Sequence, residues 1–300
     1  MSRWTPADLP DQTGRTALVT GANSGLGFWT SVELARHGAR VLMACRNPAK
    51  AEEALNRVRA EAPRAQVELV ALDLASLASV ERAADDVAGR ITQLDLLVNN
   101  AGIMAVPQGK TEDGFELQFG TNHLGHFALT GRLLPLLKAG TAPRVITVSS
   151  GAHKTGTMDF ENLMRSRKYK RWGAYGQSKL ANLLFTSELD RRAGGQLLAA
   201  AAHPGYANTH LQSGQGNRAL ELLMKLGNAT LAQSDSMGAW PQLYAATMPD
   251  VGGNDYYGPH QLELRGHPKK VGRTSKASNA ADAARLWQVS EELTKVTYDL

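Results

Sequence analysis

The stretch Thr20-Gly21-Ala22-Asn23-Ser24-Gly25-Leu26-Gly27 follows a short apolar run at residues 16–20 and precedes a segment of helical periodicity. That segment runs from about Gly25 to His37, and Gly38 is well placed to end it. The pattern predicts a strand, a glycine-rich turn and a helix. Such a turn indicates a dinucleotide site, because glycines let backbone amides approach a pyrophosphate that the helix N-terminus also attracts. Its T-G-x-x-x-G-x-G spacing departs from G-x-G-x-x-G, and a turn shaped only for tight packing is the alternative.

Short apolar or β-branched runs alternate with helical segments along the rest of the chain, which is typical of βαβ units around a parallel sheet. At 300 residues, 43% hydrophobic and 20% charged, the chain has ample material for one core. We expect an α/β, Rossmann-like, doubly wound parallel sheet flanked by helices, in a single domain over residues 1–300. The expected strands are Thr16 to Thr20, Arg40 to Ala44, Val67 to Leu72, Leu94 to Val98, Arg144 to Ser149 and Gln196 to Ala202, followed by a last strand from Tyr256 and a final helix from Arg285 to Thr294.

Composition excludes several classes of protein. Cys45 is the only cysteine, so no intrachain disulfide can form, and we expect a reducing, cytoplasmic location. The first residues lack the apolar run of a signal peptide, and no uncharged apolar stretch is long enough to span a bilayer. The formal net charge of +5 fits either nucleic acid or a phosphate-bearing cofactor and favours neither.

Tyr175 and Lys179 stand four residues apart, which places both side chains on one face of a helix. An ammonium beside a phenol favours the ionised phenol, so we expect Lys179 to keep the pKa of Tyr175 below its ordinary value of about 10. A tyrosine tuned in this way exchanges a proton with an alcohol or a carbonyl. Two common residues also meet at this spacing by chance, and a packed tyrosine beside a solvated lysine is the alternative.

Seven motifs follow one another in a defined order. They are Thr20 to Gly27, Asp73, Asn99-Asn100-Ala101-Gly102, Asn122, Ser149-Ser150, Tyr175 to Lys179 and Pro204-Gly205. In this set and order the chain resembles the short-chain dehydrogenases/reductases over nearly its whole length. The resemblance implies hydride transfer between a nicotinamide cofactor and a carbonyl or alcohol. It also implies a catalytic tetrad of Asn122, Ser150, Tyr175 and Lys179, in which Ser150 polarises the substrate oxygen, Tyr175 is the general acid or base and Asn122 holds a relay water.

Asn122 is expected within a long helix, from about Asp113 to Lys138. Asparagine competes for backbone hydrogen bonds inside helices, so its position predicts a local distortion or a bound water. His123 and His126 in the same segment have no partners at metal-ligand spacing. We therefore interpret them as structural or surface groups and expect no metal.

The resemblance also implies where the cofactor binds. A part at about 14–150 would bind the dinucleotide, and a part at about 151–300 would hold the substrate. The implied cofactor residues are Gly21, Asn23, Ser24, Gly25, Leu26, Gly27, Arg46, Asp73, Leu74, Asn100, Ala101, Gly102, Tyr175, Lys179, Pro204, Gly205 and Thr209. Asp73 would accept a hydrogen bond from the adenine amino group, and Thr209 would lie near the carboxamide. Asp73 or Ser76 as a helix cap, and a plain turn at 99–102, are the alternatives.

The end of the second strand predicts the cofactor. An acidic residue there would bond the adenosine ribose and repel a 2′-phosphate, whereas this chain has Cys45 followed by Arg46. Arg46 can bind that phosphate bidentately, so NADP is favoured. NAD stays possible because Asn23 and Ser24 occupy loop positions where some NADP enzymes carry a second basic residue. Arg46 as a solvated surface charge is the alternative.

Two variable segments bear on the substrate. The 24 residues between Ser150 and Tyr175 contain an insertion at 153–172, and this long connection resembles the retinol dehydrogenase and protochlorophyllide reductase branch of the family. A cap at 206–237 contains an apolar helix, Arg218 to Leu226, that closes over a lipophilic substrate or, equally, packs on the core or a partner. We expect a lipophilic carbonyl or alcohol and, by family habit, a homodimer or homotetramer.

Two other functional classes stay open. A regulatory protein could keep the dinucleotide fold without chemistry, although the complete tetrad argues against this. The basic run from Arg165 to Arg171 could contact nucleic acid or an acidic membrane. Such runs are more often solvated helix faces, so we expect no nucleic-acid partner.

Overall fold

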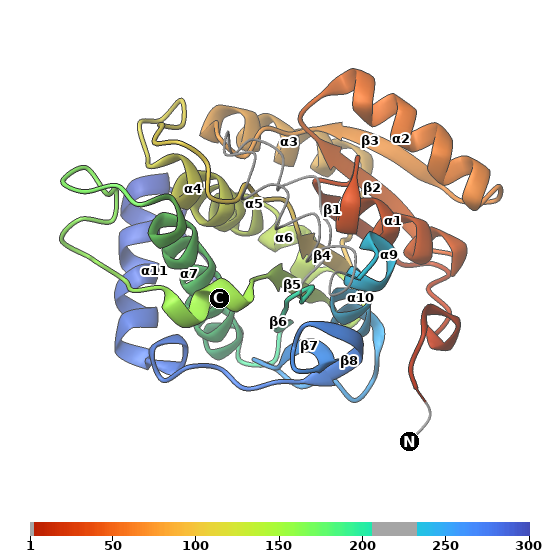
Figure 1. The fold of residues 1–300 in the computed structure, drawn as a ribbon. Coiled ribbons are helices and arrows are strands. Elements are labelled where there is room, and N and C mark those ends of the chain that lie inside the picture. Colours follow the sequence, from red (N-terminus) through yellow and green to blue (C-terminus); the bar gives the residue numbers. More distant parts are fainter. Residues whose placement is uncertain (1–2, 206–232) are drawn as a thin grey trace, which may run out of the picture.

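The computed structural model describes residues 3–205 and 233–300, built around one eight-stranded sheet (Figure 1). The strand order is β3-β2-β1-β4-β5-β6-β7-β8, with β1 to β7 parallel and β8 antiparallel to β7. The strands are β1 (Thr16–Thr20), β2 (Arg40–Cys45), β3 (Val67–Ala71), β4 (Leu96–Asn99), β5 (Arg144–Val148), β6 (Leu198–Ala202), β7 (Tyr256–Gln261) and β8 (Arg265–Lys270). The expected doubly wound parallel sheet in a single domain is confirmed.

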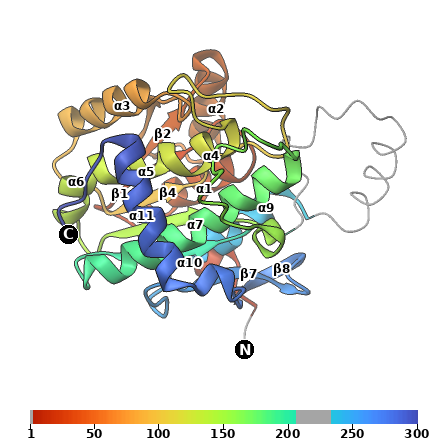
Figure 2. The ribbon, with the colours of Figure 1, turned by 90° about the vertical axis from the view of Figure 1, so that its left-hand side faces the viewer.

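Helices cover both faces of this sheet. The α-helices of the described residues are α1 (Gly25–Arg36), α2 (Pro48–Glu61), α3 (Leu77–Arg90), α4 (Leu117–Phe119), α5 (Gly125–Arg132), α6 (Leu134–Lys138), α7 (Arg171–Ala193), α9 (Asp235–Gly238), α10 (Trp240–Thr247) and α11 (Ala280–Thr294). The 3₁₀ turns are η1 (Pro6–Asp8), η3 (Gly151–Thr155) and η5 (Lys276–Ser278). Figure 2 shows α11 crossing α7, with which it is in contact. No helix within 3–205 and 233–300 has the length and apolar character needed to span a membrane.

The strands are apolar on both sides because both sides are covered. Successive side chains of a strand point to opposite faces. In β1, Ala17 and Val19 pack with residues of α1, α2 and α10, whereas Leu18 packs with residues of α3, α5 and α7. The central strands therefore appear in the sequence as continuous apolar runs, and this is why their positions could be predicted.

The ends of several elements differ from the sequence expectation. β4 begins at Leu96 and not at Leu94, because the Leu94 amide donates to the Leu136 carbonyl and not to a neighbouring strand. β6 begins at Leu198 and not Gln196. The final helix begins at Ala280, five residues earlier than expected, because the Asn279 side chain caps it. The antiparallel hairpin of β7 and β8 was not predicted.

The long helix expected from Asp113 to Lys138 is wrong in its start and in its continuity. It begins at Leu117, where the Glu116 carboxylate accepts hydrogen bonds from the amides of Gln118 and Phe119. A π turn, η2 (Gly120–Leu124), then separates α4 from α5. The distortion predicted at Asn122 is thus confirmed, and π turns of this kind are frequent at functional sites.

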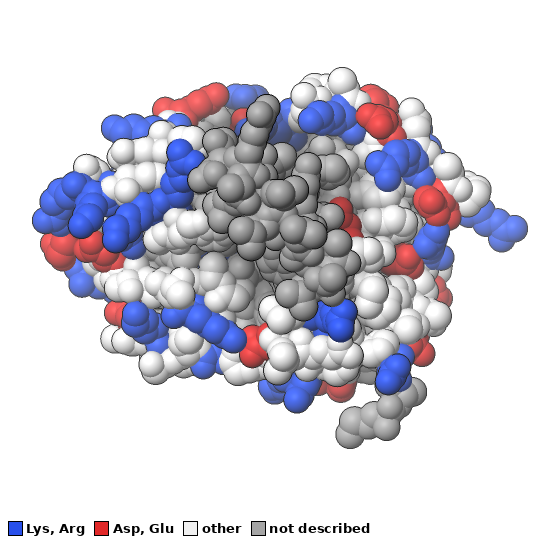
Figure 3. All heavy atoms as spheres, viewed as in Figure 1, with Lys and Arg blue, Asp and Glu red and all other residues white. Residues whose placement is uncertain are grey.

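The insertion at 153–172 is irregular between η3 and α7 and is held to the rest of the chain by several hydrogen bonds. The Tyr169 hydroxyl donates to the Val106 carbonyl at 2.9 Å, and Gln177 of α7 donates to the Leu163 carbonyl at 2.8 Å. The basic run within the insertion is loop up to Lys170 and not a helix face. Figure 3 shows Lys and Arg side chains gathered at the left margin of the molecule, where Figure 1 places this loop.

Candidate active site

A cavity of about 420 Å³ lies at the carboxyl ends of β1, β2, β3 and β4. The sheet order reverses between β1 and β4, which is where open α/β sheets bind ligands. The lining residues are Gly21, Asn23, Ser24, Gly25, Leu26, Ala44, Arg46, Lys50, Leu72, Asp73, Leu74, Asn100, Ala101, Gly102, Ile103 and Thr121. The glycine-rich turn, Arg46, the Asp73 motif and the 99–102 motif therefore meet at one place.

The glycine-rich turn both lines the cavity and packs tightly. Gly21 and Gly25 have positive φ angles of 65° and 56°, which other residues rarely adopt. A Cβ atom on Gly27 would lie 2.4 Å from the Gly21 carbonyl oxygen and 2.6 Å from Nδ2 of Asn100. Gly27 does not line the cavity, so the packing alternative holds for this glycine, and the other glycines of the turn form the cavity wall.

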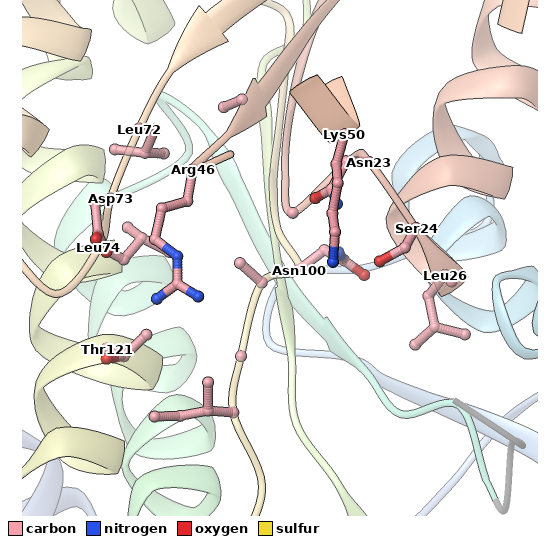
Figure 4. A pocket seen from close by; sticks show the side chains of 16 residues that line it. Asn23, Ser24, Leu26, Arg46, Lys50, Leu72, Asp73, Leu74, Asn100 and Thr121 are labelled. Carbon is pink, nitrogen blue, oxygen red and sulfur yellow. The ribbon is translucent and has the colours of Figure 1, made fainter. Parts of the chain in front are cut away.

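Two cations point into the cavity, as Figure 4 shows for Arg46 and Lys50. Arg46 follows β2, and Lys50 lies in the first turn of α2, whose N-cap is Asn47. Both side chains are exposed, and neither forms an ion pair with another described residue. Sequence reasoning missed Lys50. Lys50 stands four residues after Arg46, at the start of a helix, and this spacing could have indicated that both side chains face the same site.

The loop after β3 contains both a cavity-lining carboxylate, Asp73, and a helix cap, Ser76. Oδ1 of Asp73 accepts a hydrogen bond from the Ala75 amide at 2.9 Å, and Asp73 lines the cavity. Ser76 is the N-cap of α3 and accepts from the Ser79 amide. The helix cap is therefore Ser76, and Asp73 lines the cavity.

The four residues of the predicted tetrad come from three places in the fold, and two of them, Asn122 and Lys179, lie beside Gly102. Asn122 lies in η2, Ser150 follows β5, and Tyr175 and Lys179 lie on α7. A Cβ atom on Gly102 would lie 3.1 Å from Oδ1 of Asn122 and 3.4 Å from Nζ of Lys179. The polar ends of two tetrad residues thus reach the wall of the cavity, and a Cβ atom at position 102 would be in tight contact with Oδ1 of Asn122.

Asn122 is held by both neighbouring elements. Its Oδ1 accepts from the Ile103 amide at 2.8 Å, and its Nδ2 donates to the Ile103 carbonyl and to Oγ of Ser178, each at 2.9 Å. Lys179 donates from Nζ to the Val148 carbonyl at 3.0 Å. Both N–H groups and one of the two acceptor positions of the Asn122 side-chain amide are therefore hydrogen-bonded, so this side chain is rigidly placed.

The two adjacent serines have different partners. Ser149 is buried and its hydroxyl donates to the Lys179 carbonyl at 2.8 Å. Ser150 is half-buried, caps η3 through the Ala152 amide, and hydrogen-bonds to Tyr175. The serine whose hydroxyl faces the tyrosine is the second one.

The expected effect of Lys179 on Tyr175 is wrong in direction. Burial raises the pKa of Tyr175 to about 12, opposed by the hydrogen bond with Ser150, and lowers the pKa of Lys179 to about 8. Nζ of Lys179 lies 5.8 Å from the centre of the Tyr175 ring. Desolvation of the buried phenol therefore outweighs the ammonium, and the tyrosine is protonated at neutral pH.

Several sequence-predicted cofactor residues lie elsewhere. Tyr175, Lys179, Pro204 and Gly205 do not line this cavity, although Lys179 reaches Gly102 on its wall. Thr209 and most of the 206–237 cap, with its helix at 218–226, lie outside the described residues. Sequence reasoning missed five lining residues. Ala44 and Leu72 lie at the ends of β2 and β3, Ile103 lies in the loop after β4, Thr121 lies in the π turn, and Lys50 lies in the first turn of α2.

His123 and His126 are both buried, so the surface alternative for them is wrong. Nε2 of His123 is 2.9 Å from Oγ of Ser290 on α11, and its ring lies tilted against the Phe119 ring, with 5.2 Å between the centroids. Burial lowers the pKa of His123 to about 3 and that of His126 to about 4, so both rings are neutral at physiological pH.

The cavity fits a phosphate-bearing dinucleotide. Glycines at 21, 25 and 102 leave the backbone open to a ligand, the N-terminus of α1 faces the cavity, and Arg46 and Lys50 supply positive charge. Asp73 and Asn100 also line the cavity and offer polar side chains to the groups of a nucleoside.

Known proteins match this chain closely. Residues 15–219 match the family model for short chain dehydrogenases. Mouse retinol dehydrogenase 14 is 40% identical over 297 residues, covering 93% of this chain and 85% of the relative, and human polyprenol dehydrogenase is 37% identical, covering 96% and 87%. A crystal structure from Mycobacterium paratuberculosis has 47% sequence identity and a TM-score of 0.83 over the full length of both chains. A short chain dehydrogenase from Shigella flexneri complexed with NADP, 21% identical, shares the fold with a TM-score of 0.63 over 83% of this chain and 97% of its own.

Proposed function

The chain belongs to the short-chain dehydrogenase family, and we propose that it interconverts a lipophilic aldehyde or ketone and its alcohol, using NADP(H) and Tyr175. Membership makes it an NAD(P)-dependent oxidoreductase acting on CH–OH and C=O groups, as the sequence motifs predicted. The observation that carries the proposal is the meeting at Gly102 of Asn122, Lys179 and a cation-lined cavity.

In this proposal the cofactor is held by residues of the 14–150 part, and the 151–300 part holds the substrate. Gly21, Asn23, Ser24, Gly25, Leu26, Asn100 and Ala101 would bind the pyrophosphate and ribose groups, with Asp73 and Leu74 at the adenine end. When bound, the nicotinamide supplies or accepts the hydride. Pro204 and Gly205, at the end of β6, would contact its carboxamide side, and Thr209 would do so as well.

The chain's own residues handle the proton. Ser150 would donate a hydrogen bond to the substrate oxygen, and Tyr175 would give that oxygen a proton during reduction or remove it during oxidation. A protonated Tyr175 suits reduction at neutral pH, because burial keeps its pKa at about 12. Lys179 would bond the ribose and pass the proton toward a water held at Asn122.

The preference for NADP rests on charge at the mouth of the cavity. The last residue of β2 is Cys45, whose thiol stays neutral because burial raises its pKa to about 11, and Arg46 follows it. Lys50 adds the second basic group that the glycine loop lacks. Two cations without an ion-pair partner in the described part of the chain favour a cofactor with an added phosphate.

The lipophilic substrate class is supported by the relatives. Retinol dehydrogenases from mouse and human and polyprenol dehydrogenases from both match over most of this chain, and their names specify long isoprenoid alcohols. The insertion at 153–172, which is anchored beside the tetrad by Tyr169 and Gln177, would form one wall of the substrate site. We further propose a homodimer or homotetramer, which sedimentation velocity would test.

A carbonyl panel tests the proposal. Purified protein would be assayed with NADPH or NADH against retinaldehyde, a ten-carbon aldehyde and glyceraldehyde, with nicotinamide absorbance as the readout. We expect a higher kcat/KM for NADPH than for NADH and for the long aldehydes than for glyceraldehyde. Equal kcat/KM for glyceraldehyde would overturn the lipophilic class, and a lower dissociation constant for NADH than for NADPH would overturn the cofactor preference.

A further inference from the structure

His126 joins two parts of the molecule that are distant in sequence. It lies on the first turn of α5, directly after the π turn that contains Asn122, and it is 1% exposed. Nδ1 of its ring is 3.0 Å from the Asn122 carbonyl oxygen, and Nε2 is 2.9 Å from Oγ1 of Thr20. The imidazole therefore spans from the proposed catalytic asparagine to the last residue of β1.

The direction of each hydrogen bond follows from its partner. A carbonyl oxygen only accepts, so Nδ1 of His126 must carry the proton. Oγ1 of Thr20 already accepts from the amides of Asn100 and Ala101, each at 2.9 Å. Its own proton is left for Nε2 of His126 at 2.9 Å, since the alternative acceptor, the Val98 carbonyl, is 3.4 Å away.

The ring satisfies this pattern only as the neutral Nδ1–H tautomer. Burial, with a further contribution from the Lys179 charge, lowers the pKa of His126 to about 4. Both ring nitrogens then have a partner, as buried polar atoms require. His123, three residues earlier and equally buried, bonds Ser290 of α11 and takes no part in this chain of hydrogen bonds.

We propose that His126 is a positioning residue, a neutral bridge that holds the catalytic turn at Asn122 in register with the nucleotide-binding loop at 100–102. The bridge runs from the Asn122 carbonyl through the imidazole to the Thr20 hydroxyl, and from there to the Asn100 and Ala101 amides. This inference rests on the proposed role of Asn122 in the tetrad.

The bridge has a specific mechanical consequence. The Asn122 side chain already forms hydrogen bonds with Ile103, which is next to Gly102, and with Ser178 on α7. The imidazole adds a second link, which runs from the Asn122 carbonyl through the Thr20 hydroxyl to the Asn100 and Ala101 amides of the same loop. The distance between the nucleotide loop and α7 is thereby set from both ends of Asn122. Small misplacements of reacting groups, of about 1 Å, cost roughly 10²-fold in rate.

The tautomer can be measured in the unaltered protein. Long-range ¹H–¹⁵N correlation spectra of protein labelled with ¹⁵N-histidine, at pH 7, distinguish Nδ1–H from Nε2–H rings, and the His126→Gln variant assigns the signal. We expect the Nδ1–H form for His126. An Nε2–H or doubly protonated ring would overturn the bridge, whatever the substrate of the enzyme is.

Three variants separate positioning from packing. His126→Phe keeps the ring but loses both hydrogen bonds, His126→Gln can donate and accept in their place, and His123→Phe is the matched control on the same segment. We expect His126→Phe to lower kcat with retinaldehyde at least tenfold while changing the NADPH dissociation constant less than threefold. His126→Gln should recover most of the loss, and His123→Phe should stay within twofold of the parent.

Thr20→Val tests the other end of the bridge. If both substitutions break one link, the double variant Thr20→Val/His126→Phe should lose less than the product of the two single losses. Multiplicative losses, equal losses in His126→Gln and His126→Phe, or an unchanged kcat in His126→Phe would each contradict the proposal. NADPH binding, followed by nucleotide fluorescence, shows in every variant whether the dinucleotide site is intact. Intact binding with no turnover by the parent protein would instead contradict the proposed substrate class.

Discussion

The cavity wall around Arg46 and the cluster around Tyr175 are adjacent, but they differ in solvent exposure and in charge. Arg46 and Lys50 are exposed, charged and without ion-pair partners among the described residues, so the cavity is prepared for an anion. Tyr175 and Lys179 are buried. Burial raises the pKa of Tyr175 and lowers that of Lys179, and so favours the neutral form of each side chain. Gly102 is the boundary between them. The contrast teaches that an exposed, charged environment suits the binding of an anion and a buried one suits proton exchange, and that the loop at Gly102 connects the two.

Removing the phenolic hydroxyl should have the largest effect. In Tyr175→Phe the ring still packs, but the group that exchanges the proton is gone, so kcat with retinaldehyde should fall by about 10²–10⁴-fold. NADPH binding should change little, because the cavity does not include Tyr175. Single-turnover kinetics and fluorescence titration measure the two quantities. Parental turnover in a folded Tyr175→Phe protein would remove Tyr175 from the mechanism.

The next largest effect concerns acid stability and arises in the buried region. Burial holds the pKa of His123 near 3 and those of His126 and His203 near 4, whereas in the unfolded chain each titrates near its ordinary value of about 6.5. Below pH 6.5 the unfolded state binds more protons, so the free energy of unfolding should decrease as pH falls toward 4. The upper limit is about 1.4 kcal/mol per histidine and pH unit.

Urea unfolding at pH 7.5, 6.5, 5.5 and 4.5 measures this slope. His153 is a fourth buried histidine in the described part of the chain, and burial lowers its pKa as well. In His123→Gln one of these four rings is absent, so the slope between pH 6 and 4.5 should be shallower than in the parent. A free energy of unfolding that stays constant from pH 7 to 4.5 would show that these rings do not titrate on unfolding.

On the charged side, Arg46→Leu should raise the KM for NADPH by roughly 10- to 100-fold while leaving that for NADH nearly unchanged. A hydrogen-bonded charge pair with a phosphate contributes about 1.5–3 kcal/mol, which corresponds to this range. Initial rates with each cofactor at saturating retinaldehyde provide the comparison. A parallel increase for NADH would mean that Arg46 supports the whole dinucleotide and does not select the 2′-phosphate.

The smallest effect is expected for Lys50→Met, roughly three- to tenfold in the KM for NADPH, because lysine acts as a point charge. Screening should reduce the difference between variant and parent as salt rises from about 0.05 to 0.5 M. Lys269→Met, which removes an exposed lysine on β8 far from the cavity lining, is the matched control. If both lysine variants change the KM equally, the effect reflects net charge and not a site at Lys50.

Features that depend on local chain chemistry could be predicted. The glycine-rich turn, the end of α1 before Gly38 and the distortion at Asn122 each follow from the backbone preferences of residues next to them. Features that depend on where a local element faces, or that have a weak pattern, were missed. Lys50 lines the cavity because the first turn of α2 follows β2 directly and faces it. The hairpin of β7 and β8 was missed because its strands alternate only weakly between apolar and polar residues.

The sequence by itself determined the order of motifs, the parallel sheet and the residue types available for catalysis, since these depend on short-range patterns and on chain order. Tertiary structure decided the electrostatics. The pair Tyr175 and Lys179 predicted an acidic phenol, and burial by surrounding elements reversed the sign. It also decided the partners of His126, because a ring nitrogen meets Thr20 only when α5 packs against the end of β1. Spacing along a chain specifies which groups share a face, whereas desolvation and hydrogen bonding depend on everything that closes over that face.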